Sequence, residues 1–342
     1  MIETIYIENE LMATPQAQRI LAQFPTADKI ACDRYTEVFN PKKQNFRLQK
    51  QKPALIIAQK FDRHVLRAPD DYGIGGIHNY YFSYMLNCIY DCRYCFLQGM
   101  YQSAHYVLFI NYSDFFHSMD SILTNHKNEN VWFFSGYDCD SLALDPISGF
   151  TSHLIDFLKY RKNAYVELRT KSTQIRSLLK APPMTNLIVA FSMSPTKTAD
   201  KFEHKTPSIE KRLNAMRKLA DKGWPIGLRF DPLIFDSSFE ERYRTLFAEV
   251  FSVLSPEDIH SVTIGPFRMP KPFFQKLVAL YPEEPLLASP FQLRSGSITY
   301  AQTQEEQMMQ FCQHELRNYI ATNKIFSCWT GGEHAKAENV CT

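Results

Sequence analysis

The sequence of 342 residues lacks a long apolar run: no stretch approaches the roughly 20 apolar residues that a membrane-spanning helix requires. It also has little net charge, because 38 Lys and Arg against 36 Asp and Glu give a formal charge of +2. That total carries no signature of a nucleic-acid binder. The first residues, MIETIYIENE, are acidic where a secretory signal would be basic. We therefore expect a cytoplasmic protein with no membrane partner.

The sequence has no low-complexity segment and no internal repeat beyond a regular alternation of apolar and helical stretches. With 45% hydrophobic and 14% aromatic residues, a chain of this length can bury a large core. From residue 79 onward the alternation is typical of a parallel sheet built from βαβ units. It predicts strands over 79–86, 131–135, 164–169, 187–193, 225–231 and 261–265. It predicts helices over 113–125, 147–161, 173–180, 207–222, 238–253 and 270–280.

Six βα units are two fewer than the eight that close a full barrel, so we expect an α/β fold with a partial, open (β/α)6 barrel over residues 79–280. Residues 1–78 are interpreted as an N-terminal extension. Residues 281–342 are predicted to form a small C-terminal element, a Gly-centred hairpin at 294–302 and a helix at 304–322. In such a fold the functional site lies at the carboxyl ends of the strands.

Cysteine is present eight times, and three of these residues form a CxxxCxxC run after the first predicted strand, at Cys88, Cys92 and Cys95. In a long chain without an export signal, metal ligation is favoured over disulfides for so tight a cluster. Structural zinc has four protein ligands, often from two knuckles, and only one knuckle is present here. Three thiolates can instead hold three irons of a [4Fe–4S] cluster and leave the fourth iron open to a small chelating molecule. The remaining cysteines are expected to be buried small side chains or inert surface thiols: Cys32, Cys139, Cys312, Cys328 and Cys341.

The CxxxCxxC run has an aromatic residue, Tyr94, directly before its last cysteine. In this position on a partial βα barrel it resembles the radical S-adenosylmethionine (SAM) superfamily. The resemblance implies that SAM chelates the open iron. It also implies that the reduced cluster cleaves SAM to a 5′-deoxyadenosyl radical that abstracts hydrogen, and that a flavodoxin- or ferredoxin-type protein supplies the electron.

Over roughly residues 45–330 the chain resembles the spore photoproduct lyase family. The resemblance implies repair of a methylene-bridged thymine dimer in DNA, by hydrogen abstraction from the lesion and return of hydrogen to the product radical. It is carried by the segments CRYCFLQG (92–99), SGYDCDSLALD (135–145), RTKS (169–172), VAFSMSP (189–195), RFDPLIF (229–235) and IGPFRMPK (264–271), and by the C-terminal hairpin.

The same resemblance implies that Lys171 binds the carboxylate of SAM, that Ser192 contacts its ribose and that residues around Asp231 border its adenine. A zwitterionic amino acid group needs one cation and a few neutral acceptors, which these side chains provide. Without the resemblance, Lys171 would be interpreted as a solvated lysine at the start of a helix. The remaining candidates for SAM binding are Ser194, Ser135 and Gly136.

The chain departs from the lyase pattern at two positions. Where the lyases carry the cysteine that donates hydrogen, this chain has Tyr137, and the nearest thiol is Cys139. If the strand stays extended there, Cys139 lies on the same face as Tyr137 and is a candidate donor, but it could equally be a neutral cysteine that lines the pocket. The lyases also have tyrosines on both sides of the last cysteine as a radical relay, whereas here Tyr94 is matched by Phe96, which has no O–H. The catalytic candidates are therefore Cys139, Tyr137 and Tyr94.

Candidate contacts to DNA are Arg268 at the sixth strand end and Arg294 and Tyr300 in the hairpin, because a hairpin with a cation and an aromatic ring can wedge into a duplex. A basic run either contacts phosphates or is a solvated loop. Two alternative functions stay open: a radical SAM enzyme with a different substrate, and an iron–sulfur protein that binds SAM and nucleic acid without turnover. The oligomeric state is not predicted. The basic run consists of Lys42, Lys43, Arg47, Lys50 and Lys52.

Overall fold

The computed structural model describes residues 2–39, 41–42, 44–69 and 72–327. Lys43, Cys328 and Cys341, named above, lie outside these residues. Within the described ranges, no helix combines the length and the apolar character needed to cross a membrane.

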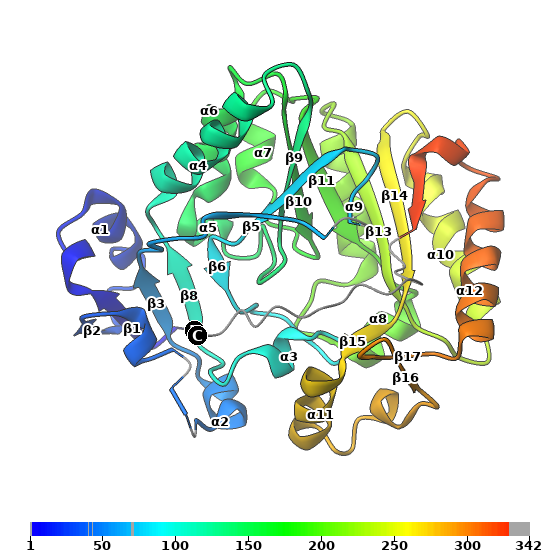
Figure 1. The fold of residues 1–342 in the computed structure, drawn as a ribbon, viewed down its shortest axis with the longest axis horizontal. Helices are drawn as coiled ribbons and strands as arrows, with labels where there is room; N and C mark the ends of the chain where they lie inside the picture. Colours follow the sequence, from blue (N-terminus) through cyan, green and yellow to red (C-terminus); the bar gives the residue numbers. More distant parts are fainter. Residues whose placement is uncertain (1, 40, 43, 70–71, 328–342) are drawn as a thin grey trace.

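The larger sheet has eight strands in the order β18-β14-β13-β11-β10-β9-β5-β4 and curls into an open half-barrel (Figure 1). Its six central strands run parallel, as the alternating pattern predicts. The sequence did not predict the two outer strands, β18 (Ile325–Ser327), which is parallel to β14, and β4 (Val65–Arg67), which is antiparallel to β5. The central strands are β5 (His78–Phe82), β9 (Val131–Ser135), β10 (Ala164–Thr170), β11 (Leu187–Ser192), β13 (Ile226–Leu233) and β14 (Ile259–Pro266).

Helices cover the outer face of this sheet, where alternate strand residues such as Val166 and Leu168 join the main core. The single helix expected over 147–161 is wrong, because the chain breaks at Gly149, whose φ of +66° suits glycine. The helices are α4 (Tyr112–Asn125), α5 (Asp145–Ser148), α6 (Phe150–Leu158), α7 (Arg176–Lys180), α8 (Thr196–Phe202), α9 (Ile209–Ala220) and α10 (Phe239–Val253).

The inner face of the half-barrel carries the other alternate residues. Trp132, Phe134 and Ile188 form a second, small apolar core there with Ile74, which comes from the segment before β5. Residues 72–77 therefore cover part of the concave face.

The smaller sheet has five strands, in the order β2-β1-β3-β8-β6, and lies beside the half-barrel (Figure 1). Most of it comes from the segment interpreted as an extension, which thus has a sheet of its own. The strands are β1 (Thr4–Glu8), β2 (Asp28–Cys32), β3 (Leu55–Ala58), β6 (Met85–Leu86) and β8 (Tyr106–Phe109). Two helices accompany it, α1 (Pro15–Leu21) and α2 (Phe46–Gln51).

The expected strand over 79–86 is divided between the two sheets, which corrects that prediction. β5 ends at Phe82 in the half-barrel, and β6 begins at Met85 in the smaller sheet, antiparallel to β8. Tyr84 fixes the crossing, since its buried hydroxyl donates to the Ser141 carbonyl at 2.8 Å and its own carbonyl accepts from the Phe109 N–H at 3.0 Å. The segment that carries the three cysteines follows directly.

The C-terminal part contains the predicted hairpin, which extends a short strand after β14 into a three-stranded sheet. The helix expected over 304–322 ends earlier, at Leu316. These elements are β15 (Arg268–Pro270), α11 (Lys271–Leu280), β16 (Gln292–Arg294), β17 (Ser297–Thr299) and α12 (Gln302–Leu316). Short elements near the cysteines are β7 (Asp91–Cys92), α3 (Leu97–Met100) and β12 (Glu203–His204), and the 3₁₀ helices are η1 (Asn9–Leu11), η2 (Tyr35–Glu37), η3 (Pro285–Ala288) and η4 (Thr322–Lys324).

Candidate functional site

The cysteine segment is held in place by backbone hydrogen bonds to the region after α8. β7 pairs antiparallel with β12, which sets Cys92 opposite Glu203, and the Arg93 N–H donates to the Phe202 carbonyl at 2.8 Å. The Cys95 N–H donates to the Cys92 carbonyl at 3.1 Å and closes the turn between the last two cysteines. The segment is thus a fixed loop at the carboxyl end of the half-barrel.

The three thiols are partly or fully buried and close enough to influence one another's ionisation. Burial raises the pKa of Cys88 to about 12, and it also raises the pKa of Cys92 and of Cys95. Lys171 opposes this increase at Cys92 and Cys95. Among the described residues, the three sulfurs are not grouped within 4.8 Å of one another. Three thiol donors on one loop match a [4Fe–4S] cluster with one open iron better than a closed zinc site with four protein ligands.

Lys171 lies beside the cysteine loop and is not a freely solvated residue. Its ammonium group sits 5.4 Å from the centre of the Tyr94 ring. Burial lowers its pKa, but the charges of Cys92 and Glu203 outweigh this and raise the pKa overall, so Lys171 stays cationic. A permanent cation therefore faces the loop from the end of β10.

Glu203 is the centre of a buried polar network that the sequence did not reveal. Its carboxylate accepts from the Tyr94 hydroxyl, from the Ser194 hydroxyl at 2.9 Å and from the Arg212 guanidinium at 2.5 Å. Burial disfavours its charge, but Lys171 and Arg212 hold the pKa of Glu203 below its ordinary value. Tyr94, a predicted catalytic residue, and Ser194, a predicted SAM-binding residue, are both bound to this carboxylate.

Asp140 positions the segment that carries Lys171. Its carboxylate accepts from the Thr170 hydroxyl and from the Lys171 N–H, both at 2.6 Å, and from the Ala143 N–H at 2.9 Å. It thereby ties the loop after β9 to the loop after β10. Gly136 begins the first of these loops with φ of +96°, and a Cβ there would lie 3.0 Å from the Arg169 carbonyl oxygen.

The remaining serine candidates are buried near the strand ends. The Ser135 hydroxyl accepts from the Ser141 hydroxyl at 3.1 Å, and the Ser192 carbonyl accepts from Arg212 at 3.0 Å. Each is the last residue of its strand, so both lie at the carboxyl end of the half-barrel, where the cysteine loop also lies. Their roles toward SAM stay predictions.

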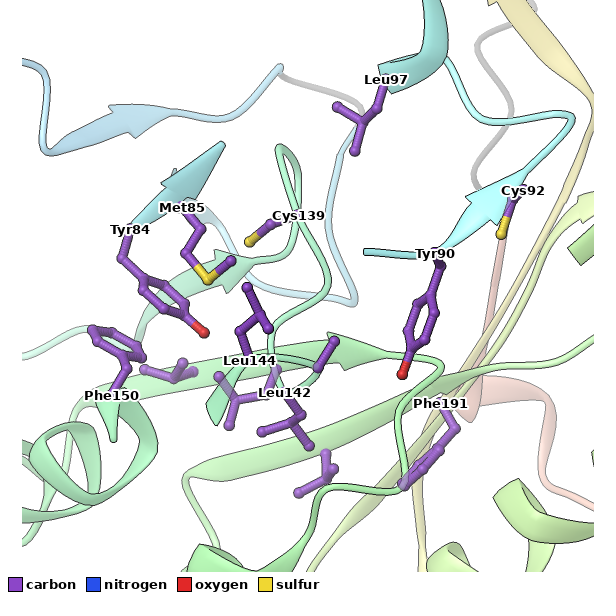
Figure 2. Close-up of a cluster of buried hydrophobic side chains, with 14 of the residues drawn as sticks. Tyr84, Met85, Tyr90, Cys92, Leu97, Cys139, Leu142, Leu144, Phe150 and Phe191 are labelled. Carbon is purple, nitrogen blue, oxygen red and sulfur yellow. The ribbon is translucent and has the colours of Figure 1, made fainter. Parts of the chain in front are cut away.

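Cys139 and Tyr137 lie in different environments, because the strand does not stay extended there, which was the condition for a shared face. β9 ends at Ser135, and residues 137–139 form a bend in place of an extended strand. Tyr137 is 50% exposed, whereas Cys139 is 6% exposed. Burial raises the pKa of Cys139 well above its usual range, and the next cause is the charge of Cys88. Figure 2 shows Cys139 beside Met85, whose backbone is hydrogen-bonded to the thiol.

The two positions that depart from the lyase pattern contact each other. The Phe96 and Tyr137 rings have centroids 5.3 Å apart, and Tyr81 lies 5.2 Å from Tyr137 on its other side. Phe273 of α11 extends the row at 6.5 Å from Phe96. Tyr81, Tyr137, Phe96 and Phe273 form a partly exposed aromatic surface beside the cysteine loop, and the sequence did not show that positions 96 and 137 belong to one surface.

Side chains of positive and negative charge alternate in a chain of ion pairs that begins on the inner face of the half-barrel. Arg229 and Glu167 form a bidentate pair at 3.0 and 2.6 Å, with side chains 0% and 2% exposed. Arg169 lies 3.8 Å from Glu167 and 3.9 Å from Asp231. Asp231 pairs in turn with Arg268 at 3.0 Å, so a predicted SAM-binding residue and a predicted DNA contact are joined.

The hairpin residues proposed to contact DNA are mostly engaged within the fold, which corrects that expectation. Tyr300 is only 1% exposed, and its hydroxyl accepts from the Phe235 N–H at 3.0 Å, so its ring is not available to stack on a base. Arg294 pairs with the buried Glu305 at 2.6 Å. These side chains secure the hairpin against α12 and the loop after β13.

The basic run is divided in the same way. Lys50 is turned inward, where its ammonium group lies 3.6 Å from Asp91 and donates to Gln98 at 3.3 Å. Lys52 pairs at the surface with Glu3 at 3.0 Å, and Lys42 and Arg47 are exposed. The solvated interpretation therefore holds for part of the run, and Lys50 supports the cysteine loop.

A family model described as "Spore photoproduct lyase" matches residues 2–325. Among curated proteins, spore photoproduct lyase of Geobacillus sp. (strain Y412MC61) is 25% identical over 202 residues, which are 58% of this chain and 59% of that protein. The enzyme of Bacillus subtilis (strain 168) is 25% identical over 211 residues, 60% of this chain and 61% of that protein. These matches span about three fifths of the relatives' length.

Solved structures of spore photoproduct lyase share the fold. One, complexed with dinucleoside spore photoproduct, has a TM-score of 0.82 and 18% sequence identity, covering 96% of this chain and 98% of that one. Another, a double mutant with bound AdoMet and dinucleoside spore photoproduct, has a TM-score of 0.80 at 18% identity and the same coverage.

Proposed function

This chain belongs to the spore photoproduct lyase family, and on that basis we propose that it is a radical SAM enzyme. One observation carries the proposal: the CxxxCxxC loop lies at the carboxyl end of a half-barrel with a cationic Lys171 directed to it. A loop of three thiols serves other purposes in other folds. Here the three thiols could hold a cluster whose open iron chelates the amino acid group of SAM, and the buried lysine could bind the carboxylate of that group.

Cys88, Cys92 and Cys95 would hold three irons of a [4Fe–4S] cluster, since a set of three thiolates fits such a group with one iron open better than a closed zinc site. When bound, the cluster and SAM together supply a 5′-deoxyadenosyl radical that removes a hydrogen atom from the substrate. The protein's own part is to bury the thiols, to exclude water and to orient SAM. We take a flavodoxin- or ferredoxin-type protein as the reductant.

Lys171 would pair with the SAM carboxylate, because the neighbouring Cys92 and Glu203 raise its pKa and keep its ammonium group charged beside the loop. Asp140 fixes the Lys171 backbone, so the side chain leaves the strand end in a defined direction. Glu203 balances the charges of Lys171 and Arg212 and holds the Tyr94 hydroxyl by a hydrogen bond. Tyr94 is therefore placed to act near the cluster but is bound to a carboxylate.

The leading substrate is the spore photoproduct in DNA. Two structural relatives hold the dinucleoside form of that lesion, and the half-barrel of this chain has the same architecture. Arg169 and Arg268 line its inner face next to Asp231, and a phosphate or a base carbonyl is the kind of group that such guanidinium side chains bind.

A second candidate, a radical SAM reaction on a different substrate, is favoured by the contact between Phe96 and Tyr137. The two residues that replace lyase functional groups belong to one aromatic surface, in which the Tyr137 ring is half exposed. Because the two residues are in contact, their replacement alters one continuous surface. Phe96 lacks the hydroxyl of the relay tyrosine, and Tyr137 puts an aromatic ring where the lyases have the donor cysteine.

Anaerobic incubation of the reduced, reconstituted protein with SAM and a dinucleotide spore photoproduct tests the proposal. We expect 5′-deoxyadenosine together with thymidine products. Release of 5′-deoxyadenosine with no thymidine product would support the different-substrate candidate. Bound SAM with an intact cluster and no 5′-deoxyadenosine would leave a binding protein without turnover.

Cysteine variants provide the control for the cluster assignment. Cys92→Ala should lose SAM cleavage, because three thiolates are the minimum that holds the cluster with one iron open. Cys312→Ala removes a buried cysteine of α12, outside the CxxxCxxC run, and should keep full cleavage. Full cleavage by Cys92→Ala would refute the assignment.

A further inference from the structure

Three metal-binding side chains meet at the end of the half-barrel opposite the cysteine loop. His78 is the first residue of β5, and His126 directly follows α4. Glu129 lies two residues before β9, whose Val131 pairs with His78 in the sheet register. The amino-terminal ends of β5 and β9 therefore bring His78 against the turn that carries His126 and Glu129.

The donor atoms of these residues converge. All lie within 4.8 Å of one another. Nε2 of His78 contacts a carboxylate oxygen of Glu129, and Nδ1 of His126 lies 3.5 Å from that same oxygen. The His78 and His126 rings are stacked with centroids 3.8 Å apart. Tetrahedral ligands of zinc at about 2.0–2.1 Å from the ion are about 3.4 Å apart, so the donor atoms already have nearly the required spacing, and the stacked rings would turn to direct both nitrogen lone pairs at one ion.

Neighbouring groups hold His126 and Glu129 in this arrangement. The Glu129 N–H donates to the His126 carbonyl at 3.1 Å, and the Asn163 side chain donates to the carbonyls of both residues at 3.4 Å. The Tyr80 hydroxyl is 3.3 Å from Nε2 of His126. When Tyr80 accepts the Nε2 proton, the lone pair of Nδ1 points toward Glu129, which is the outer-shell arrangement of metal-bound histidines.

The cluster is open on one side. The two histidine side chains are each 22% exposed and the Glu129 side chain is 58% exposed, so an ion and a water ligand can reach the donors. A simple ion pair accounts for the contact between His78 and Glu129. A second ion pair accounts in the same way for the contact of His126 with that oxygen, so the case for a metal rests on the convergence of all three donors and on the orientation of His126 by Tyr80.

We propose that His78, His126 and Glu129 bind a divalent transition-metal ion, and that Zn²⁺ fits them best. Two imidazole nitrogens and one carboxylate oxygen suit zinc, whereas Mg²⁺ and Ca²⁺ prefer oxygen ligands alone. Water would complete the four-coordinate site. The ion fastens the turn between α4 and β9 to the start of β5, far from the cysteines. With three protein ligands and a water, the site has the open form of a zinc site and not the closed four-ligand form, and it is independent of the radical chemistry proposed above.

The test uses protein with its iron–sulfur cluster fully loaded, so that zinc cannot occupy the cysteines. We expect one zinc per chain, with an X-ray absorption spectrum showing nitrogen and oxygen scatterers at about 2.0–2.1 Å. Sulfur scattering at about 2.3 Å would place the zinc on cysteines and overturn the proposal.

Variants then locate the ion. His78→Ala and Glu129→Gln should each weaken zinc binding by more than about 100-fold, and Tyr80→Phe by about 10-fold, the range typical of an outer-shell partner. His117→Gln, a change at an exposed histidine of α4, should bind zinc like the unaltered protein. Equal zinc affinity in His78→Ala and the unaltered protein would also overturn the proposal, whatever the enzymatic activity.

Discussion

At the scale of single residues, Lys171 offers the sharpest test of SAM binding. Lys171→Met keeps the length of the side chain but removes the charge. SAM affinity should fall roughly 10- to 100-fold, because a charge-assisted hydrogen bond to a carboxylate contributes about 1.5–3 kcal/mol. The SAM dissociation constant is measured by equilibrium binding to the reconstituted protein, alongside its iron content.

Lys162→Met is the matched control, since Lys162 is exposed just before β10 and lies at the opposite end of that strand. Its SAM affinity should be unchanged. An unaltered dissociation constant in Lys171→Met, with iron fully retained, would remove Lys171 from the SAM site.

Cys139 and Tyr137 are separated by the bend after β9, and this makes the hydrogen donor a question for mutagenesis. Cys139 is buried near Cys88, which favours it over the half-exposed Tyr137, and a phenolic O–H is a stronger bond than a thiol S–H. Cys139→Ala should keep its iron and still release 5′-deoxyadenosine, but divert the product radical to adducts. Tyr137→Phe should give normal products. Product analysis by mass spectrometry distinguishes these outcomes.

Three results would contradict that assignment. Loss of iron from Cys139→Ala would make Cys139 a ligand of the cluster in place of a donor. Adducts from Tyr137→Phe alone would transfer the donor role to the tyrosine. Identical products in the unaltered protein and in both variants would mean that neither residue donates hydrogen.

At the scale of elements, the pair between Arg229 of β13 and Glu167 of β10 spans β11, which lies between these strands. Arg229→Met should lower the free energy of unfolding by about 3–5 kcal/mol, because it removes the bidentate partner of the buried Glu167 carboxylate and leaves it with the more distant Arg169 at 3.8 Å. The double variant Glu167→Leu with Arg229→Met should recover most of that loss, since an apolar pair needs no compensating charge.

Urea unfolding of the two single variants and the double variant measures the coupling. If the double variant is as unstable as the sum of the single variants, the pair contributes no coupling. The inner face of the half-barrel would then depend on packing alone.

The six central strands of the half-barrel were predictable because each is a short apolar run bounded by helical stretches. The division of 79–86 was not, because its cause is a partner strand, β8, some twenty residues later. The site residues show the same contrast between local patterns and distant partners. Cys88 and Lys171 belong to recognisable local patterns, whereas Glu203 stands in the charged stretch KFEHK and looks solvated until Arg212 and Tyr94 surround it.

The hairpin was misinterpreted for a related physical reason. A turn with Arg294 and Tyr300 has the composition of a surface loop, but burial is decided by distant residues. The Phe235 N–H donates to the Tyr300 hydroxyl, and Arg294 donates to Glu305. Nothing in residues 294–302 indicates these partners.

At the scale of the whole molecule, His260 of β14 should make stability depend on pH. Burial, with Arg229 next, lowers its pKa to about 4, and its Nδ1 has no hydrogen-bond partner among the described residues. An unfolded chain binds a proton here below about pH 6.5 while the folded chain stays neutral. The stability contributed by the neutral ring is therefore complete above pH 6.5 and decreases as pH falls toward 4.

Urea unfolding at pH 7.5 and 5.5 should show this loss as about 1 kcal/mol, reduced from the full linkage value because the ring is partly exposed. His260→Phe should lack that part of the loss, and His117→Gln should keep it. An equal loss in His260→Phe and the unaltered protein would show that His260 does not cause it.

The crossing of the chain between Phe82 and Met85 places the cysteine loop at the junction of two sheets that are formed from distant parts of the sequence. A loop attached at such a junction takes its shape only when both sheets have assembled. Retained iron would then serve as a gauge of correct folding, and the brown colour of a preparation would measure how many chains have completed both halves of the molecule. Destabilising substitutions in the first sixty residues would lower the visible absorbance of the cluster, although none of these residues is a ligand.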